Sequence, residues 1–250
     1  MTDEGVSVSP TSILGLLLKN EELSDVELEN EISLFLFAGH ETTASTLTFM
    51  FILMHKNPET KAKIQKEVDE VLGGRVPTFE DIKNLRYTTA VMKETLRLFP
   101  IGWASIRETK EPVQLGDYAI PAKVQMFVNF LHMQRNPAVF DRPTEFIPER
   151  WLTPSSEVEG VSEDVNAMAA GTIPYSYLPF SGGMRSCIGK PFAEIETKMV
   201  AAMLVQRFDF RVEEPKEWEG IPACDLYLDG LTLRPMPHTV WVTPRKVHQE

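Results

Sequence analysis

Cysteine is nearly absent from this chain, because Cys187 and Cys224 are the only two among 250 residues. Two cysteines in a chain of this length do not make a disulfide framework, which favours a reducing compartment. Basic charge is also in deficit, since 25 Lys and Arg face 36 Asp and Glu for a net charge of -11. The sequence therefore predicts no nucleic acid as a main partner.

A basic N-terminal region is missing too, so no signal peptide is expected. Residues 32–54 are apolar enough to suggest a transmembrane helix, but their middle carries His40 and Glu41. An acid at the centre of a bilayer helix costs roughly 2.5–3.5 kcal/mol. We therefore expect no membrane span, and we interpret the stretch as a long buried helix with a polar interruption.

Metal and nucleotide motifs are absent as well. None of the five histidines has the HxxxH or HxH spacing of a metal site, and no GxGxxG or Walker-type loop occurs. A Cys-His hydrolase is conceivable, but Cys187 has no evident His partner in the sequence.

The expected fold is mainly helical with a minor β part. Ser24 and Glu27 form a capping box at the start of a helix that ends near His55, before Asn57-Pro58. The expected core of that helix is Leu34, Phe35, Phe37, Ala38, Leu47, Phe51 and Met54. Further helices are expected over 58–72, after Thr78, over 86–98 and over 188–207.

Short strands make up the β part. A hairpin is expected from 113–115 and 118–120 around Gly116-Asp117, followed by a third strand over 124–130. Weak alternation after Phe208 predicts further short strands, including 231–233 and 240–242. The polar, acidic residues 155–164 are expected to form an exposed loop.

The most informative run is FSGGMRSCIG, residues 180–189. It places Cys187 after a glycine-rich turn, at the mouth of an expected helix whose terminal amides and dipole favour a thiolate. One thiolate as the only protein ligand suits haem, whereas zinc and iron–sulfur sites need several ligands. The alternative is a buried, inert cysteine on a glycine turn.

Neighbours of this cysteine suit a flat cofactor. Gly182 and Gly183 remove side chains that would block the cofactor face. Arg185 could pair with a cofactor carboxylate, and Phe180 could keep water from the sulfur.

Two other sets of residues could contribute chemistry. Within the long helix, small residues at Ala38 and Gly39 allow a ligand to approach, and Glu41 with Thr42 could pass protons. Ser and Thr also occur in helices without function. Glu94 and Arg97 are i,i+3 neighbours, and Arg150 could complete a buried network with them, although a surface ion pair is the commoner outcome of this spacing.

Taken together, these sets resemble the cytochromes P450, which are haem-thiolate monooxygenases. The 180–189 run is similar to the family's haem-binding loop, and residues 38–43 to the oxygen-activation segment of its central helix. Glu94 and Arg97 are similar to its E-x-x-R pair, and residues 148–150 to its downstream arginine motif. The resemblance covers residues 24–250 as the C-terminal part of the family's fold, after a lead-in over 1–23.

The resemblance implies a role for each candidate residue. Cys187 would be the axial metal ligand of heme b, and Thr42 with Glu41 would guide protons to the bound oxygen. Arg185 and Arg107 would bind haem propionates. Glu94, Arg97 and Arg150 would form a structural triad behind the haem. The remaining cofactor-binding positions implied are Phe180, Gly183, Gly189, Ala38 and Gly39.

The implied reaction inserts one oxygen atom from O2 into a small lipophilic substrate, with electrons from an NADPH-dependent reductase. Full-length eukaryotic members lie on the endoplasmic reticulum membrane facing the cytoplasm. This chain departs from the family at Gln134-Arg135, where members often carry His-Arg, and at Trp151, where they often carry Phe. Family members are also roughly twice as long, and the resemblance implies that this chain corresponds to the C-terminal half of their fold.

Two alternatives remain open. One is a truncated haem binder without turnover, and the other is an unrelated thiol enzyme that uses Cys187 without haem.

Overall fold

The computed structural model describes residues 8–152, 175–213, 226–229, 232–235 and 239–245. Its described part is mainly helical with short strands, as predicted. The chain divides into two compact units, one ending at Glu41 and the other beginning at Thr42. The predicted loop at 155–164 and Cys224 lie outside the described residues.

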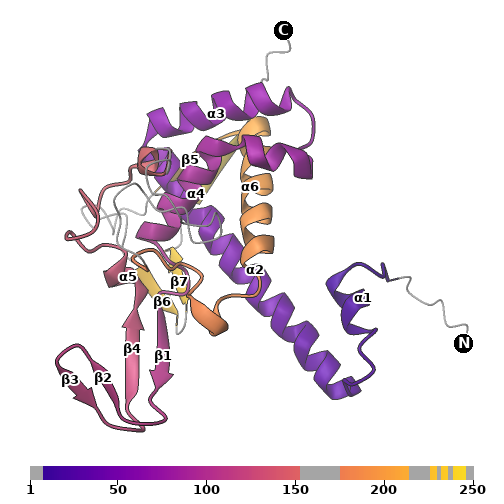
Figure 1. Cartoon of the computed structure of the whole chain (residues 1–250). Helices are drawn as coiled ribbons and strands as arrows, with labels where there is room; N and C mark the ends of the chain where they lie inside the picture. The colour runs from indigo at the N-terminus through magenta and orange to yellow at the C-terminus, as the bar shows by residue number, and fades with distance from the viewer. Residues whose placement is uncertain (1–7, 153–174, 214–225, 230–231, 236–238, 246–250) are drawn as a thin grey trace, which may run out of the picture. The chain divides into compact units, whose positions relative to one another are not determined.

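The elements follow one another in the order that Figure 1 shows. The α-helices are α1 (Ile13–Leu17), α2 (Asp25–Lys56), α3 (Pro58–Leu72), α4 (Arg86–Leu98), α5 (Phe130–Met133) and α6 (Lys190–Arg207), and the 3-10 helices are η1 (Phe79–Asn84), η2 (Pro148–Trp151) and η3 (Gly183–Arg185). The strands are β1 (Ala104–Glu108), β2 (Val113–Leu115), β3 (Tyr118–Ile120), β4 (Gln125–Asn129), β5 (Phe208–Glu213), β6 (Leu226–Asp229), β7 (Thr232–Pro235) and β8 (Thr239–Pro244).

Helix α2 begins at the predicted capping box. The backbone N–H of Ser24 donates to the Glu27 carboxylate at 2.9 Å, and the backbone N–H of Glu27 donates to the Ser24 hydroxyl at 3.4 Å. The two side chains thereby satisfy amide groups that a helix start otherwise leaves unpaired. Among the described residues, no helix has the length and apolar content needed to cross a membrane.

The predicted core of α2 is wrong in its first half. Leu34 is 58% exposed and Phe37 is 67% exposed, and Ala38 is exposed as well. The buried apolar residues of α2 lie nearer its C-terminal end, and they are Phe49, Met50, Ile52, Leu53 and Met54. Apolar character alone does not bury a residue, because burial needs a second element on that face.

Helix α3 has the predicted limits. Pro58 opens it and Gly73 ends it in the left-handed conformation with φ +53°, which glycine adopts without a steric penalty. Asn57 occupies the cap position before α3, but its side chain makes no capping bond there. Instead its Nδ2 donates to the Leu53 carbonyl at 2.8 Å, so Asn57 closes the end of α2.

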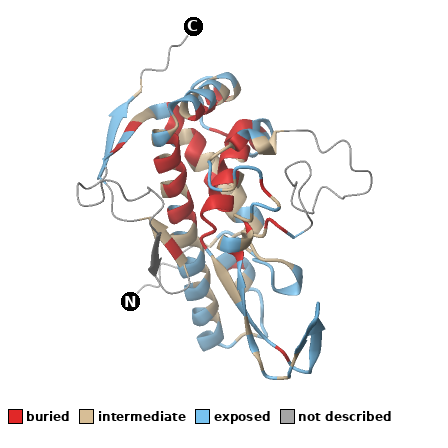
Figure 2. Cartoon of the chain, turned by 90° about the vertical axis from the view of Figure 1, so that its left-hand side faces the viewer, coloured by how far each residue is buried: buried red, intermediate tan, exposed pale blue. Residues whose placement is uncertain are grey.

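The main core joins the C-terminal part of α2 with α3, α4 and α6. Phe49 of α2 stacks on Phe99, directly after α4, with ring centroids 4.5 Å apart. Phe51 meets Phe210 of β5 edge to face at the same separation. Figure 2 shows that buried residues gather in these helices. The hairpin of β2 and β3, at the lower right of that view, is almost wholly exposed.

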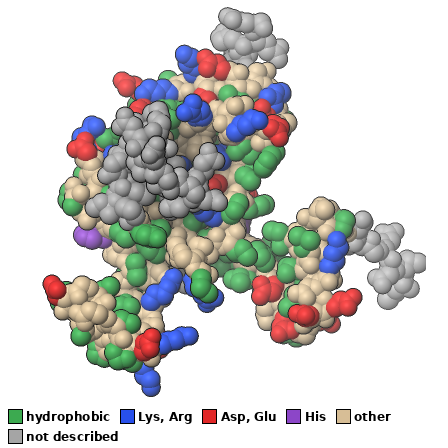
Figure 3. All heavy atoms as spheres, in the orientation of Figure 1, with side chains coloured by type: hydrophobic (Ala, Val, Ile, Leu, Met, Phe, Trp, Pro, Cys, Tyr) green, Lys and Arg blue, Asp and Glu red, His purple; other side chains and the backbone are tan. Residues whose placement is uncertain are grey.

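Within the described residues, the β part consists of four two-stranded antiparallel sheets, which pair β1 with β4, β2 with β3, β5 with β8 and β6 with β7. The β2–β3 hairpin has its predicted limits, and Gly116 in its turn has φ +57°. The third predicted strand exists as β4, but its partner β1 was not predicted. Leu115 and Tyr118 are more than half exposed, and this hairpin shows green apolar patches at the lower left of Figure 3.

A carboxylate holds η1 to the turn after α3. Arg75 donates to both oxygens of Asp81 at 2.6 Å, and the backbone N–H and hydroxyl of Thr78 donate to Oδ2 at 2.7 and 2.8 Å. The hydrogen bonds from the Arg75 guanidinium are the main cause that holds the pKa of Asp81 well below its usual range. The backbone N–H and hydroxyl of Thr78 lower this pKa further. These bonds favour the charged form of the carboxyl group.

Replacing Asp81 with asparagine is expected to lower the Tm at neutral pH and to flatten its acid dependence. A folded-state pKa below the unfolded value gives stability that is present above about pH 4 and is lost as the pH falls further. Thermal denaturation followed by circular dichroism at neutral pH and at about pH 3 measures both effects. Asp117→Asn, at an exposed acid, is the control and should keep the original acid dependence. Equal behaviour of the two variants would contradict the assignment.

Candidate functional site

Glu94 and Arg97 form a fully buried ion pair on α4. The guanidinium donates from Nε to Oε2 and from Nη2 to Oε1, both at 2.9 Å, and both side chains are 0% exposed. Such a two-bond contact has fixed geometry, and breaking it inside a protein leaves a charge without its partner. The pair is therefore not the surface ion pair that its spacing alone would most often produce.

Glu94 also binds the segment around η2. Its carboxylate accepts from Arg150 Nε at 3.0 Å, from the Trp151 indole N–H at 2.9 Å and from the backbone N–H of Ile147 at 2.9 Å. The structure thus brings Glu94, Arg97 and Arg150 together. The Trp151 contact was missed, although a buried indole N–H usually needs an acceptor and this tryptophan directly follows Arg150.

Arg97 binds backbone carbonyl groups on the other side of the pair. Its Nη1 donates to the carbonyl oxygens of Gln134 at 3.0 Å and Pro143 at 2.6 Å, and its Nη2 donates to that of Glu145 at 3.0 Å. Nothing in the sequence marked these three acceptors, because every residue carries a carbonyl group. Together the two charged side chains fasten the chain from 134 to 151 onto α4.

The segment 180–189, called the cysteine loop from here on, is held by hydrogen bonds within its own backbone. The N–H of Cys187 donates to the Phe180 carbonyl at 2.9 Å, and the N–H of Ser186 donates to the Gly183 carbonyl at 3.0 Å. Gly183 has φ +73°, a backbone conformation that glycine adopts without a steric penalty, and there is open space where its side chain would begin. It therefore permits the turn of the loop and leaves the space beside it unobstructed. Ser181 also has positive φ, at 61°, which the glycine-based prediction did not include.

Cys187 itself is exposed, which excludes the alternative of a buried cysteine on a glycine turn. Helix α6 begins at Lys190, two residues later than predicted, with Gly189 in the cap position. A Cβ built on Gly189 would lie 3.8 Å from the Cys187 sulfur, an ordinary contact distance. The sulfur therefore lies close to the start of α6, and Cys187 remains outside the helix.

The other residues predicted to contact the cofactor near the loop differ in how far they are buried. Phe180 is half-buried and packs against the main core, and Arg185 is exposed. Arg107 is exposed on β1, where its guanidinium donates to the Ser105 hydroxyl and, at 3.0 Å, to the Ile106 carbonyl. Its side chain thus lies along its own strand.

The segment 38–43 lies within α2, and the boundary between the two units falls between Glu41 and Thr42. Gly39 has open space where a side chain would begin, and Thr42 is half-buried. The carbonyl group of Thr42 accepts a hydrogen bond from the Thr46 hydroxyl at 2.9 Å. This kind of bond back to the preceding turn often bends a helix.

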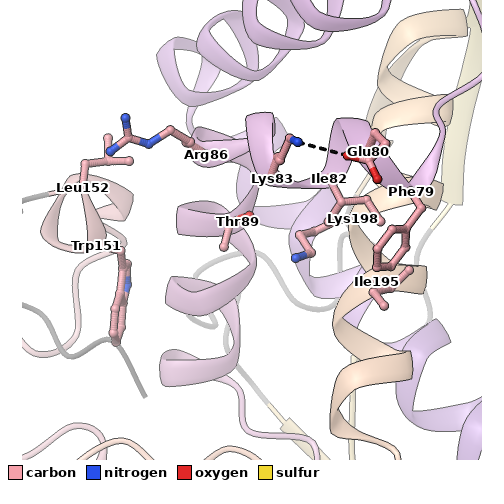
Figure 4. A pocket seen from close by; sticks show the side chains of 10 residues that line it. All are labelled: Phe79, Glu80, Ile82, Lys83, Arg86, Thr89, Trp151, Leu152, Ile195 and Lys198. Atoms are coloured by element: carbon pink, nitrogen blue, oxygen red, sulfur yellow. Dashed lines mark hydrogen bonds and ion pairs between the residues drawn. The ribbon is translucent and has the colours of Figure 1, made fainter. Parts of the chain in front are cut away.

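A separate open pocket of about 500 Å³ lies between η1, α4, η2 and α6. Lys83 pairs with Glu80 at 3.0 Å, and Figure 4 shows Lys198 near Ile195, with Trp151 and Leu152 at the other side of the view. Burial lowers the pKa of Lys198, and the nearby Glu194 carboxylate opposes that shift. None of the residues that line this pocket belongs to the cysteine loop, so the two sites are distinct.

No group of three or more His, Cys, Asp or Glu side chains suited to a metal ion occurs within the described ranges. Cys187 is thus not part of a described multi-ligand cluster.

The family model described as Cytochrome P450 matches residues 8–238. Among curated proteins, the Arabidopsis thaliana protein named "Protein LUTEIN DEFICIENT 5, chloroplastic" is 37% identical over 203 residues, covering 81% of this chain and 32% of its own length. Cyclooctatin synthase of Streptomyces melanosporofaciens is 37% identical over 215 residues, covering 86% and 44%. Cytochrome P450 4V2 of Mus musculus is 32% identical over 234 residues, covering 93% and 41%. The chain therefore spans less than half the length of these relatives.

Proposed function

Because the chain belongs to the cytochrome P450 family, we propose that it forms the cofactor-binding part of a haem-thiolate monooxygenase. The proposed reaction inserts one oxygen atom from O2 into a small lipophilic substrate, with electrons supplied by a reductase that oxidises NADPH. The observation that carries the proposal is the exposed thiol of Cys187 on a loop fixed by its own backbone. Relatives named as monooxygenases, including cyclooctat-9-en-7-ol 5-monooxygenase, support the reaction class.

The residues around Cys187 fit a haem group. Met184 and Ile188 are highly exposed apolar side chains on the same loop, and they suit a flat, largely apolar ligand. Gly183 leaves open space beside them. Arg185 is exposed and could bind a carboxylate of the haem edge.

Arg107 is the second candidate for a haem carboxylate. It would have to leave its contacts with Ser105 and Ile106, and these are exposed contacts that cost little to exchange. Phe180 supports the loop from the core side.

When bound, haem with a thiolate ligand supplies the oxygen chemistry, since electron donation from sulfur favours cleavage of the O–O bond. The contribution of this chain is ligation, positioning and proton transfer. By the family resemblance, Thr42 and Glu41 would hold and move protons for the reaction. Glu94, Arg97 and Arg150 would keep the segment 134–151 against α4, behind the cofactor.

A second candidate is a haem-binding polypeptide without turnover. The observation that favours it is the exposed apolar surface on the first part of α2, where Leu34, Leu36 and Phe37 are 58%, 70% and 67% exposed. Large exposed apolar patches usually mark surfaces that another segment or partner covers. Substrate oxidation by the purified chain with a reductase would exclude this candidate.

Haem titration of the purified chain is expected to give one haem bound per chain and a Soret band. After reduction and addition of carbon monoxide, this band should move strongly to the red, as thiolate ligation requires. Absorbance spectra measure both results. A chain that stays colourless while Cys187 reacts with alkylating reagents would contradict the proposal and favour a haem-free thiol enzyme.

A further inference from the structure

Gln134 is a polar residue buried where polar residues are uncommon. It directly follows α5 and is 0% exposed, among the largest fully buried side chains of the described residues. Burying an amide group costs free energy unless its hydrogen bonds are replaced inside the protein. The contacts of this side chain therefore indicate what it does.

The Gln134 amide joins two segments that are far apart in sequence. Its Nε2 donates to the backbone carbonyl groups of Leu96 at 2.9 Å and Arg97 at 3.1 Å, at the end of α4. Its Oε1 accepts from the backbone N–H of Leu178 at 2.7 Å. Both N–H donors and the oxygen acceptor are thus used, and all three partners are backbone groups.

Leu178 is the point at which the cysteine loop begins to turn. Its carbonyl group accepts from the N–H of Ser181 at 3.0 Å, and the carbonyl of Phe180 accepts from the N–H of Cys187 at 2.9 Å. The Leu178 side chain lies 3.2 Å from where a Cβ on Gly182 would be. A displacement of Leu178 would therefore be transmitted through the loop toward Cys187.

The residues on either side strengthen this anchor. The Tyr177 hydroxyl donates to the Lys93 carbonyl on α4 at 3.2 Å, and burial raises the pKa of Tyr177 well above its usual range, so the hydroxyl keeps its proton. Arg97 donates to the backbone carbonyl of Gln134 at 3.0 Å. The buried Glu94–Arg97 pair is thus connected, through Gln134, to the start of the cysteine loop.

We propose that Gln134 is a positioning residue that fixes the start of the cysteine loop against the end of α4 and thereby sets the place of Cys187. Only a carboxamide offers two N–H donors and one acceptor on the same group. A carboxylate would present oxygen to two carbonyl groups, and an apolar side chain would leave three backbone groups without these partners. The consequence for Cys187 as a ligand rests on the proposed function, whereas the anchoring itself does not.

Hydrogen exchange of the haem-free chain tests the anchoring. In Gln134→Met, peptides covering residues 175–189 are expected to exchange about tenfold faster. This factor corresponds to the loss of a hydrogen bond that contributes about 1.4 kcal/mol to keeping the segment closed. Peptides from α3 and β5 should keep their rates. Gln114→Met is the matched control, because Gln114 is exposed and its amide only donates to the Gly116 carbonyl in the hairpin turn.

Unchanged exchange at 175–189, or an equal increase throughout the chain, would overturn the proposal. If Gln134→Met does not fold, Gln134→Asn gives the same comparison, because its amide is one methylene too short to bridge both segments. With haem added, both variants should show a smaller fraction of the red-shifted carbon monoxide band than the unchanged chain. If the unchanged chain binds no haem, the proposed function fails, and the exchange result still decides the role of Gln134.

Discussion

A chain in which alanine replaces Glu94 is expected to lose about 3–5 kcal/mol of its free energy of unfolding, because removing one partner of a buried ion pair leaves the other charge unpaired. Arg97 would remain fully buried with its charge, and the Trp151 indole and Ile147 amide would lose their acceptor. Domains have about 5–15 kcal/mol in total, so this single change would remove much of the stability. Urea denaturation followed by circular dichroism measures the difference.

Glu80→Ala is the matched control for this prediction. Glu80 also pairs with a cation three residues away, Lys83, but their side chains are 78% and 70% exposed. Exposed pairs contribute little, and we expect a change within about 0.5 kcal/mol. Glu94→Gln, which keeps one acceptor oxygen and loses the charge, should lie between the two. A loss below about 1 kcal/mol for Glu94→Ala would show that the network is not a main source of stability.

Local signals explain which elements were predicted well. Pro58 and Gly73 limit α3, and Gly116 sets the β2–β3 turn, because each of these residues restricts or permits a particular backbone conformation within a few positions. The same holds for the Ser24–Glu27 box at the start of α2. Such features need no knowledge of the rest of the fold.

Long-range partners explain what could not be predicted. Strand β1 was missed because its pairing, Ile106 opposite Phe127, joins residues on either side of the hairpin. The exposure of Leu34 and Phe37 depends on which segments cover α2, and their apolar character does not reveal this. The sequence marked Gln134 only as a departure from the family, and its contacts could not be predicted because all three side-chain partners are backbone groups that every sequence contains.

Replacing Cys187 with serine is expected to abolish the strongly red-shifted carbon monoxide band of the haem-loaded chain. A hydroxyl has no thiolate character near neutral pH, so it cannot supply the anionic sulfur ligand that produces this band. Any haem that still binds would be held by the apolar surface and the arginines, and its carbon monoxide band should stay near the position seen without sulfur ligation. Because Cys187 is exposed and does not line the main core, the free energy of unfolding without haem should change by less than about 0.5 kcal/mol.

Cys224→Ser separates ligation from a general effect of removing a thiol. It removes the only other cysteine, and the red-shifted band should persist unchanged. If the band instead disappears in Cys224→Ser and survives in Cys187→Ser, the ligand assignment is wrong, and the glycine turn at 180–189 would have another purpose. If both variants keep it, the ligand is not a cysteine. The spectrum of these two variants therefore tests the ligand separately from turnover, which depends on a substrate and an electron donor as well as on the sulfur.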